Sequence, residues 1–166
     1  MSVFISYRHS DFALAASINQ RLRGANIETY LDKLDAESQS TEDITSVITK
    51  NIIRSTHLIA VVSASTAESW WVPFEIGEAT MLGRRISSYQ SDHIRLPEYL
   101  MKWPQMKSLD HLQLFISAYQ LEQSKPSIVA NESYGTRDST ENSLAGRRAS
   151  ADTFHRNLRD NILRTR

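Results

Sequence analysis

Cysteine is absent from this chain of 166 residues, and glycine is scarce, with five in the whole sequence. Without cysteine the chain has no disulfide bond, no thiol nucleophile and no thiolate metal site. The glycines form no phosphate-binding loop, so P-loop and kinase chemistry have no support. The five histidines show no paired ligand spacing, and we predict no metal site. Ser6, Ser63 and Ser65 lack a nucleophile elbow around them, and we interpret them as hydrogen-bonding residues of loops.

An excess of either charge is also missing, because 19 lysines and arginines are matched by 19 aspartates and glutamates. No global field therefore attracts nucleic acid or an anionic membrane, and we expect neither as a partner. No stretch approaches the roughly twenty apolar residues that span a bilayer, and residues 1–11 do not resemble a secretion signal. We expect a cytoplasmic protein with one domain and a tail.

Short apolar runs alternate with helical periodicities along the first ninety residues. The runs at 3–5, 27–31 and 58–62 predict three strands, the first and third of them buried on both faces. Each run is followed by a helical pattern. Ser10 or Asp11 is expected to cap the first helix, and Gly24 is expected to end it.

Strands that alternate with helices in this way are typical of an α/β fold with an open, mostly parallel, doubly wound sheet. In such sheets the working crevice lies beyond the carboxyl ends of the strands. Arg8 and His9 follow the first predicted strand, Asp32 follows the second, and residues 63–71 follow the third. The sequence therefore predicts that these polar and aromatic residues meet at one rim of the sheet.

The pattern weakens after residue 83. Residues 86–89 predict a fourth strand, and a helix begins at Ser108. Residues 96–103 contain Pro97, and the sequence leaves them open between helix, strand and neither. Residues 123–150 are polar and lack an apolar period, which predicts a linker or arm. Phe154, Leu158 and Ile162 mark a short amphipathic helix that docks either on its own domain or on a partner. We divide the chain into a domain at 1–121, a linker at 122–150 and a C-terminal helix at 151–166.

A glutamate among aromatic residues stands out in the segment 63–83. If a helix begins near Ser69, then Trp71, Glu75 and Ala79 share one stripe, and Glu75 takes a position that is normally apolar. Such a carboxylate either meets a partner or faces a cleft where a ligand completes it. The alternative is a glutamate on the helix surface, favoured by the dipole of its own first turns. Glu78, one turn further on, is the competing candidate.

Four segments, in order, resemble the TIR (Toll/interleukin-1 receptor) domain: VFISYRHSD at 3–11, IETYLDKLDAES at 27–38, LIAVVSAS at 58–65 and WVPFE at 71–75. Four linked segments are more specific than one short motif. The resemblance covers about ninety residues and implies a flavodoxin-like sheet of about five parallel strands. Two departures stand out. Glu37 and Ser38 replace the glycine usual in the family's second loop, and the fifth strand is not recognisable.

The resemblance also implies an activity. TIR domains divide into scaffolds that only assemble with one another and enzymes that cleave NAD+ between nicotinamide and ribose. The enzymes carry a catalytic glutamate in a tryptophan-x-x-x-glutamate pattern, which assigns that role to Glu75. NAD+ is then the substrate, and no cofactor is expected. The substrate-binding candidates are Tyr7, Arg8, His9, Asp32, Ser63, Trp70 and Trp71.

Each of these residues also has a plainer interpretation. Trp71 is equally suited to anchoring the core, Arg8 to serving as an ordinary loop cation, and Asp32 to bracing its loop. The resemblance implies that the loop starting at Asp32 gates the pocket and makes assembly contacts.

The resemblance extends to small bacterial TIR proteins of Thoeris antiphage defence. Such proteins act as NAD+ glycohydrolases, ADP-ribosyl cyclases or transferases, and their cyclic or conjugated nucleotide product switches on a separate effector protein. Two alternatives remain open. One is a non-enzymatic TIR scaffold that self-associates through residues 32–41, and the other is an enzyme that resembles nucleoside deoxyribosyltransferases.

Overall fold

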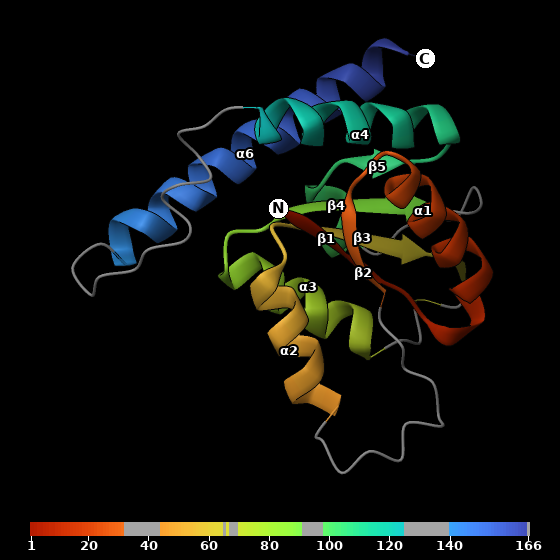
Figure 1. Ribbon diagram of the computed structural model, residues 1–166, viewed down its shortest axis with the longest axis horizontal. Helices are drawn as coiled ribbons and strands as arrows, with labels where there is room; N and C mark the ends of the chain where they lie inside the picture. Colours follow the sequence, from red (N-terminus) through yellow and green to blue (C-terminus); the bar gives the residue numbers. More distant parts are fainter. Residues whose placement is uncertain (32–43, 65, 67–69, 91–97, 125–139, 166) are drawn as a thin grey trace.

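The structure, a computed structural model, describes residues 1–31, 44–64, 66, 70–90, 98–124 and 140–165 (Figure 1). Its centre is one parallel sheet of five strands in the order β2-β1-β3-β4-β5. The strands are β1 (Ser2–Ser6), β2 (Glu28–Leu31), β3 (His57–Val62), β4 (Arg85–Gln90) and β5 (Gln105–Met106). The predicted α/β fold with a parallel sheet of about five strands is confirmed, and β2 lies at an edge.

Helices cover both faces of the sheet. They are α1 (Phe12–Gly24), α2 (Ile44–Arg54), α3 (Trp71–Met81), α4 (Leu109–Gln123) and α6 (Thr140–Arg164), with two short 3₁₀ helices, η1 (His9–Asp11) and η3 (Glu98–Lys102). One face packs against α1, α4 and α6, and the other packs against α2 and α3. Within the segment 96–103, which the sequence left undetermined, residues 98–102 form the 3₁₀ helix η3.

Side chains of β1 alternate between the two faces, as a period of two requires. Val3 and Ile5 enter the cluster under α1 and α4, whereas Phe4 enters the cluster under α2 and α3. Ser6 therefore points to the same face as Phe4. This alternation decides which side chains of the strand ends meet α3.

The ends of α1 differ in detail from the prediction. Asp11 occupies the N-cap position, but its side chain makes no capping hydrogen bond. Gly24 is the last helical residue, and Asn26 takes the left-handed backbone conformation, with φ 59°. Asparagine is among the few non-glycine residues that adopt this region readily, so it ends the helix in place of glycine.

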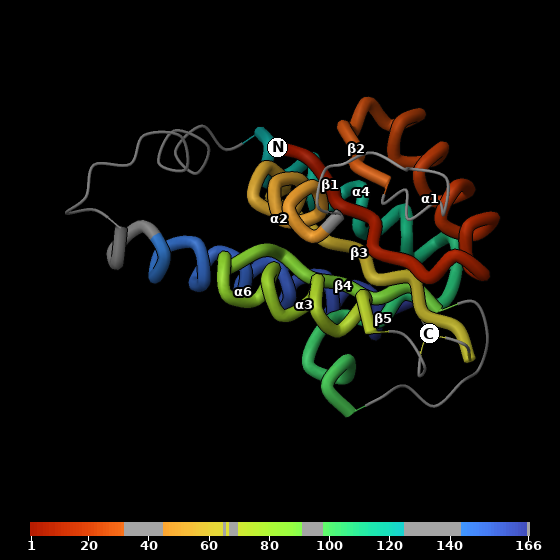
Figure 2. Tube along the Cα trace, turned by 90° about the horizontal axis from the view of Figure 1, so that it is seen from below, coloured from red at the N-terminus to blue at the C-terminus, as the bar shows by residue number. Residues whose placement is uncertain are grey.

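The C-terminal helix is longer than its apolar pattern indicates. It begins at Thr140, so residues 140–150, predicted as part of a linker, are helical. Sequence periodicity missed these turns because few of their residues are apolar. In the structure, the first turns of α6 extend past the sheet on the side where the strands begin (Figures 1 and 2). The division of the chain into domain, linker and C-terminal helix stays a prediction.

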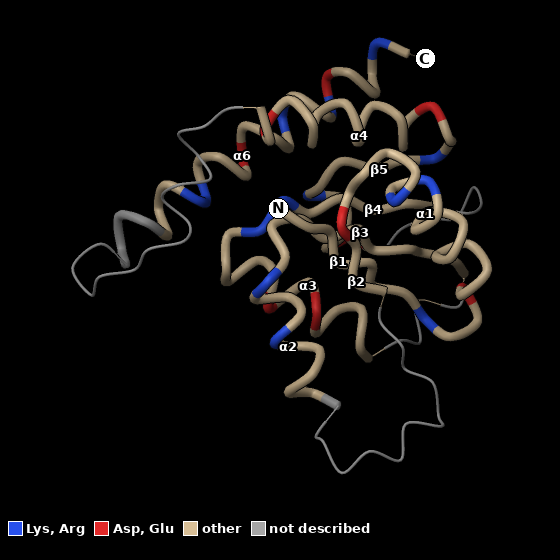
Figure 3. The backbone as a smooth tube through the Cα atoms, in the orientation of Figure 1, with Lys and Arg blue, Asp and Glu red and all other residues tan. Residues whose placement is uncertain are grey.

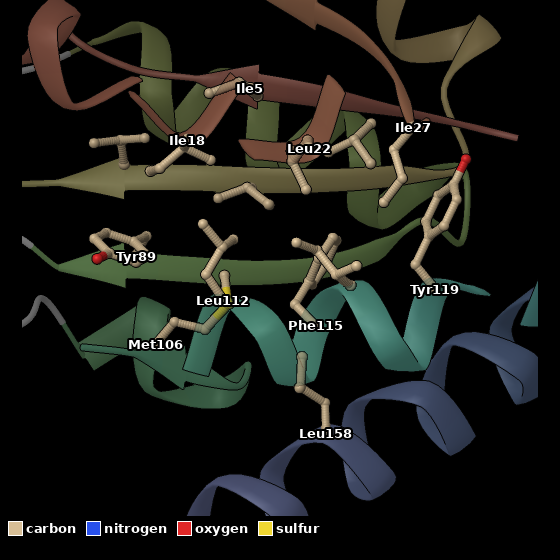
Figure 4. Packing of buried hydrophobic residues seen from close by; sticks show 14 of the residues in the cluster. Ile5, Ile18, Leu22, Ile27, Tyr89, Met106, Leu112, Phe115, Tyr119 and Leu158 are labelled. Carbon is tan, nitrogen blue, oxygen red and sulfur yellow. The ribbon is translucent and has the colours of Figure 1, made fainter. Parts of the chain in front are cut away.

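The second half of α6 belongs to the core of the domain. Phe154, Leu158 and Ile162 are buried in the same cluster as Leu112 and Phe115 of α4. Figure 4 shows Leu158 pointing from α6 toward Phe115. Of the two predicted docking modes, α6 therefore uses the one on its own domain. No helix in the described part of the chain is both long enough and apolar enough to cross a membrane.

Candidate functional site

Glu75 lies on the buried face of α3. Pro73 sits in the first turn of this helix, where the missing N–H costs no helical hydrogen bond. The residues that α3 buries are Val72, Glu75, Ile76 and Ala79, and Glu75 has 0% of its surface exposed. The alternative of a surface glutamate is therefore wrong, because the helix turns this carboxylate toward the sheet.

The carboxylate of Glu75 is held by the last residue of β1. The hydroxyl of Ser6 donates a hydrogen bond to Oε2 of Glu75, and both side chains are fully buried. Hydrogen bonds to an ionised acceptor are among the stronger ones in proteins. The interpretation of Ser6 as a loop residue is wrong in location, because Ser6 ends a strand and fixes the carboxylate at the carboxyl end of the sheet.

Glu78, the competing candidate, has a different role. Its Oε1 accepts a hydrogen bond of 2.7 Å from the hydroxyl of Thr49 on α2. This bond ties α2 to α3. Glu78 therefore braces two helices, whereas Glu75 faces the strand ends.

The exits of β1 and β3 are linked to each other at the carboxyl end of the sheet. Ser63 follows β3, and its hydroxyl donates a hydrogen bond of 2.9 Å to Oδ2 of Asp11, which explains why Asp11 does not cap α1. The amide of Ser63 also donates to the hydroxyl of Thr66 at 2.9 Å. Arg8, partly buried, and the exposed His9 follow β1 on the same rim. The predicted convergence of these segments at the carboxyl ends of the strands is thus found for residues 8, 9 and 63.

The aromatic candidates lie in three different environments. Trp70 is 89% exposed, whereas Trp71 is partly buried and contacts the ring of Phe74 edge-on, with centroids 6.0 Å apart. Tyr7 is buried on the face of α1 and α4, opposite to Ser6, and its ring contacts that of the exposed Phe12, with centroids 6.1 Å apart. Asp32 and the rest of its predicted loop lie outside the described residues. The substrate-binding roles of all these residues stay predictions.

Two buried polar residues of β4 were not singled out from the sequence. Ser88 and Gln90 are 1% and 3% exposed, and neither Oγ of Ser88 nor Oε1 of Gln90 has a hydrogen-bond partner in the structure. Ser88 is in register with Ala60 of β3, and Ala60 is in register with Ser6 of β1, so Ser88 points to the same face of the sheet as Ser6. Gln90 lies two residues further along β4 and therefore points to this face as well, which is the face that carries Glu75. Buried polar atoms without partners cost free energy that a ligand can recover. The available signal was the polar run SSYQ inside a buried strand.

Chemically, the site offers an oriented carboxylate, hydroxyl groups and, two residues after Ser6, an arginine on the same rim. Among the described residues no group of three or more metal-ligating side chains comes together. A carboxylate shielded from water can stabilise a developing positive charge more strongly than an exposed one. The arrangement therefore suits reactions that build positive charge on a substrate next to Glu75.

Comparison with known proteins gives one family and several structural neighbours. The family described as the TIR domain matches residues 3–122, which is 120 of the 166 residues. A search of curated proteins finds no match. The TIR domain of the Toll-related receptor TRR-2 from Hydra magnipapillata is similar in structure, with a TM-score of 0.55 and 18% identity over 65% of this chain and 84% of that chain.

Two further solved structures share the fold at low identity. A metazoan TIR-STING receptor from C. gigas has a TM-score of 0.56 and 20% identity over 69% of this chain, which spans only 40% of that chain. A 2-deoxyribosyltransferase from Bacillus psychrosaccharolyticus has a TM-score of 0.54 and 10% identity over 66% of this chain and 88% of that chain. At such identities the likeness shows the fold alone, but the family match covers well over half of the sequence. The chain belongs to the TIR domain family.

Proposed function

We propose that this protein cleaves the bond between nicotinamide and ribose in NAD+, with Glu75 as the catalytic carboxylate. The observation that carries the proposal is the position of Glu75, which is fully buried, held by the Ser6 hydroxyl and placed at the carboxyl end of the sheet. The family's catalytic pattern, Trp71 to Glu75, falls on this same residue.

The chemistry of NAD+ suits a site with one oriented carboxylate. The leaving group is a pyridinium that departs as neutral nicotinamide, so no general acid has to protonate it. Positive charge grows on the ribose as the bond breaks, and a buried anion stabilises that state more than the ground state. Glu75 can also hold the ribose hydroxyls or trap the sugar as a covalent ester, and Arg8 can pair with the pyrophosphate.

The attacking group then decides the product. Water gives ADP-ribose, an atom of the same molecule gives a cyclic isomer, and a second small molecule gives a conjugate. We propose that the product is a cyclic or conjugated ADP-ribose derivative that serves as a signal in bacterial antiphage defence of the Thoeris type and acts on a separate effector. This placement rests on the resemblance to the small bacterial TIR proteins.

The test is release of nicotinamide from NAD+ by the purified full chain, alone and with lysate from phage-infected cells, with products identified by mass spectrometry. Glu75→Gln keeps the side-chain shape and is expected to abolish release. Glu78→Gln is the matched control on the same helix and is expected to retain it. Equal release by wild type and Glu75→Gln would refute the assignment, and so would no release under either condition.

A scaffold function is the second candidate, and one observation favours it. Trp70, the N-cap residue of α3, lies in line with Phe74 and Met81 of the helix, and the three are 89%, 40% and 67% exposed. Exposed apolar stripes on helices are typical of protein interfaces. A TIR scaffold that self-associates through this stripe and the segment 32–41 predicts concentration-dependent oligomers whose function survives Glu75→Gln. Light scattering of wild type and Phe74→Ser would show whether the stripe mediates such assembly.

A further inference from the structure

A cavity of about 290 Å³ lies at the end of the sheet opposite to Glu75. It is bordered by the C-terminal end of α3, the turn into β4, the end of η3 and the middle of α6, and we call it the α3–α6 cavity. The residues that matter for its chemistry are Arg84, Lys102, Trp103, Arg148, Asp152 and His155. None of them belongs to the candidate site at Glu75.

The charges around this cavity are unbalanced. Arg84, Lys102 and Arg148 line it together with a single carboxylate, Asp152, which leaves an excess of two positive charges. The whole chain has no net charge, so this excess is local. Arginines recur along α6 (Figure 3). Like charges that share one cavity repel one another, and a dianion between them would relieve that repulsion.

The three cations are held in different ways. Arg84 is 7% exposed, and its Nη2 donates a hydrogen bond of 2.6 Å to the carbonyl oxygen of Ile53. Arg148 and Lys102 are exposed, and neither forms an ion pair with another residue in the described part of the chain. The Lys102 ammonium lies 5.9 Å from the ring centre of Trp103. Arg84 therefore supplies a fixed charge at the wall, and the other two side chains are available to close on a ligand.

Gly83 allows two segments that border the cavity, the turn into β4 and the helix α6, to approach each other closely. Gly83 has φ +65°, and a Cβ at this position would lie 3.3 Å from Cβ of Arg147 and 3.3 Å from Cγ of Arg148. The turn into β4 thus approaches the backbone of α6 closely. This close approach brings Arg84, the next residue in the chain, to the same cavity as Arg148.

His155 adds a neutral donor. Its Nε2 accepts a hydrogen bond of 2.8 Å from the amide of Ile86, so the proton of the neutral ring is on Nδ1. The amide of Ile86 thereby fixes which nitrogen donates. The ring lines the cavity, and its N–H is a donor suited to an oxyanion.

We propose that the α3–α6 cavity binds the phosphate of a small phosphomonoester, with Lys102 and Arg148 pairing with the phosphate oxygens, Arg84 providing the fixed charge and His155 donating from Nδ1. A phosphomonoester carries about −1.5 to −2 charges at neutral pH, which matches the local excess. Arginine recognises phosphate with paired N–H groups. The volume is near the lower end of small-molecule pockets, and Trp103 adds a flat apolar wall that suits a nucleoside monophosphate. This proposal does not depend on activity at Glu75.

The test measures binding of AMP to the full chain by calorimetry, with adenosine and inorganic phosphate as the other arms. We expect AMP to bind, adenosine to bind at least tenfold more weakly, and inorganic phosphate to compete with AMP. In ¹H–¹⁵N spectra the resonances of His155 and of the Trp103 indole are expected to shift. Absence of AMP binding, adenosine binding as tight as AMP, or absence of competition by phosphate would each overturn the proposal.

Matched variants locate the site. Lys102→Ala with Arg148→Ala is expected to weaken AMP binding at least tenfold. Arg156→Ala with Arg164→Ala removes the same charge from exposed positions of α6 outside the cavity and is expected to change affinity less than twofold. Equal weakening by both pairs would show non-specific attraction and overturn the proposal. Glu75→Gln is expected to bind AMP with the same affinity as wild type. If Glu75→Gln lost AMP binding while the Lys102→Ala, Arg148→Ala double variant kept it, AMP would bind at the Glu75 site and the proposal would be overturned.

Discussion

The Ser6 hydroxyl donates a hydrogen bond to the carboxylate of Glu75, joining the last residue of β1 to the buried face of α3 across 69 positions of sequence. Removing this donor leaves a buried carboxylate with one partner fewer. We expect Ser6→Ala to lower stability by about 1–3 kcal/mol in urea denaturation. If Glu75 acts on NAD+, the same variant is expected to lower kcat about 10-fold to 100-fold with little change in KM, because the carboxylate loses its orientation.

Ser6→Thr separates positioning from simple loss of packing. Threonine keeps the hydroxyl and suits a strand, so this variant is expected to recover most of the stability and most of kcat. An unchanged kcat in Ser6→Ala would show that Ser6 does not position the catalytic group.

The two adjacent tryptophans are expected to respond differently to truncation. Trp70 is 89% exposed, so Trp70→Ala should leave the free energy of unfolding within about 0.5 kcal/mol of wild type. Trp71 packs against the core and Phe74, and Trp71→Ala should destabilise by about 2–4 kcal/mol. Urea denaturation measures both.

Trp70 has two possible roles, stacking on the substrate and contacting another copy of the chain. Measuring NAD+ cleavage by Trp70→Ala at several protein concentrations separates them. A loss of NAD+ cleavage by Trp70→Ala at every protein concentration would assign it to substrate stacking. A loss that disappears at high concentration would assign it to assembly. Destabilisation of Trp70→Ala by more than 2 kcal/mol would contradict its exposed placement.

Docking of α6 on the domain can be measured through one buried leucine. Leu158 has no exposed surface and packs in the cluster of α1, α4 and β3. Leu158→Ala is therefore expected to destabilise the protein by about 2–5 kcal/mol. Leu163 of the same helix is 53% exposed, and Leu163→Ala serves as the control, with an expected change below about 1 kcal/mol. Equal effects of the two variants would show that α6 does not contribute to the core.

Stability is expected to depend on pH through His155. Burial lowers the pKa of His155 from 6.5 to about 4, with Arg159, His57 and Arg85 adding to the effect and Asp152 opposing it. The folded state thus holds the neutral ring while the unfolded chain binds a proton below about pH 6.5. The stabilising contribution is complete above that pH and is lost as the pH falls through about 4, by up to about 3 kcal/mol.

His155→Gln removes this titration while keeping an acceptor for the Ile86 amide. The variant is expected to lose less stability than wild type between pH 7 and pH 4.5 in urea denaturation. Direct titration by NMR should place the pKa of His155 well below 6. A His155 pKa near 6.5 would contradict the burial of the ring.

Glu122 adds a second acid-sensitive contact near the start of β3. Burial opposes ionisation of this carboxyl group, but the neighbouring side chains of His57 and Arg85 favour the ionised form and lower the pKa of Glu122. Its Oε2 lies 3.3 Å from Nε2 of His57 and 3.1 Å from Nε of Arg85. These contacts join α4 to β3 and β4, and their stabilisation is present above the unfolded carboxyl pKa of about 4.5 and lost as the pH falls through the lower folded value.

Local patterns in the sequence predicted most of the elements that position the site. The buried run from Leu58 to Val62 forms β3, and Ser108 caps α4 by accepting a hydrogen bond from the His111 amide. These features depend on short-range rules of burial and capping, so they are visible in a few consecutive residues. The two-residue β5 and the early turns of α6 carry too few apolar residues for such a rule, and the sequence did not reveal them.

The sequence by itself determined the parallel α/β class, the family resemblance and the choice of Glu75 as the candidate carboxylate, because each rests on short local patterns and their order along the chain. Only the tertiary structure decided that Glu75 faces inward, that Ser6 holds it, and that Tyr7 points to the other side of the sheet. The same holds for the α3–α6 cavity, which gathers residues 84, 102 and 148. Such contacts arise from packing between distant segments, and no local pattern specifies which side chains packing will bring together.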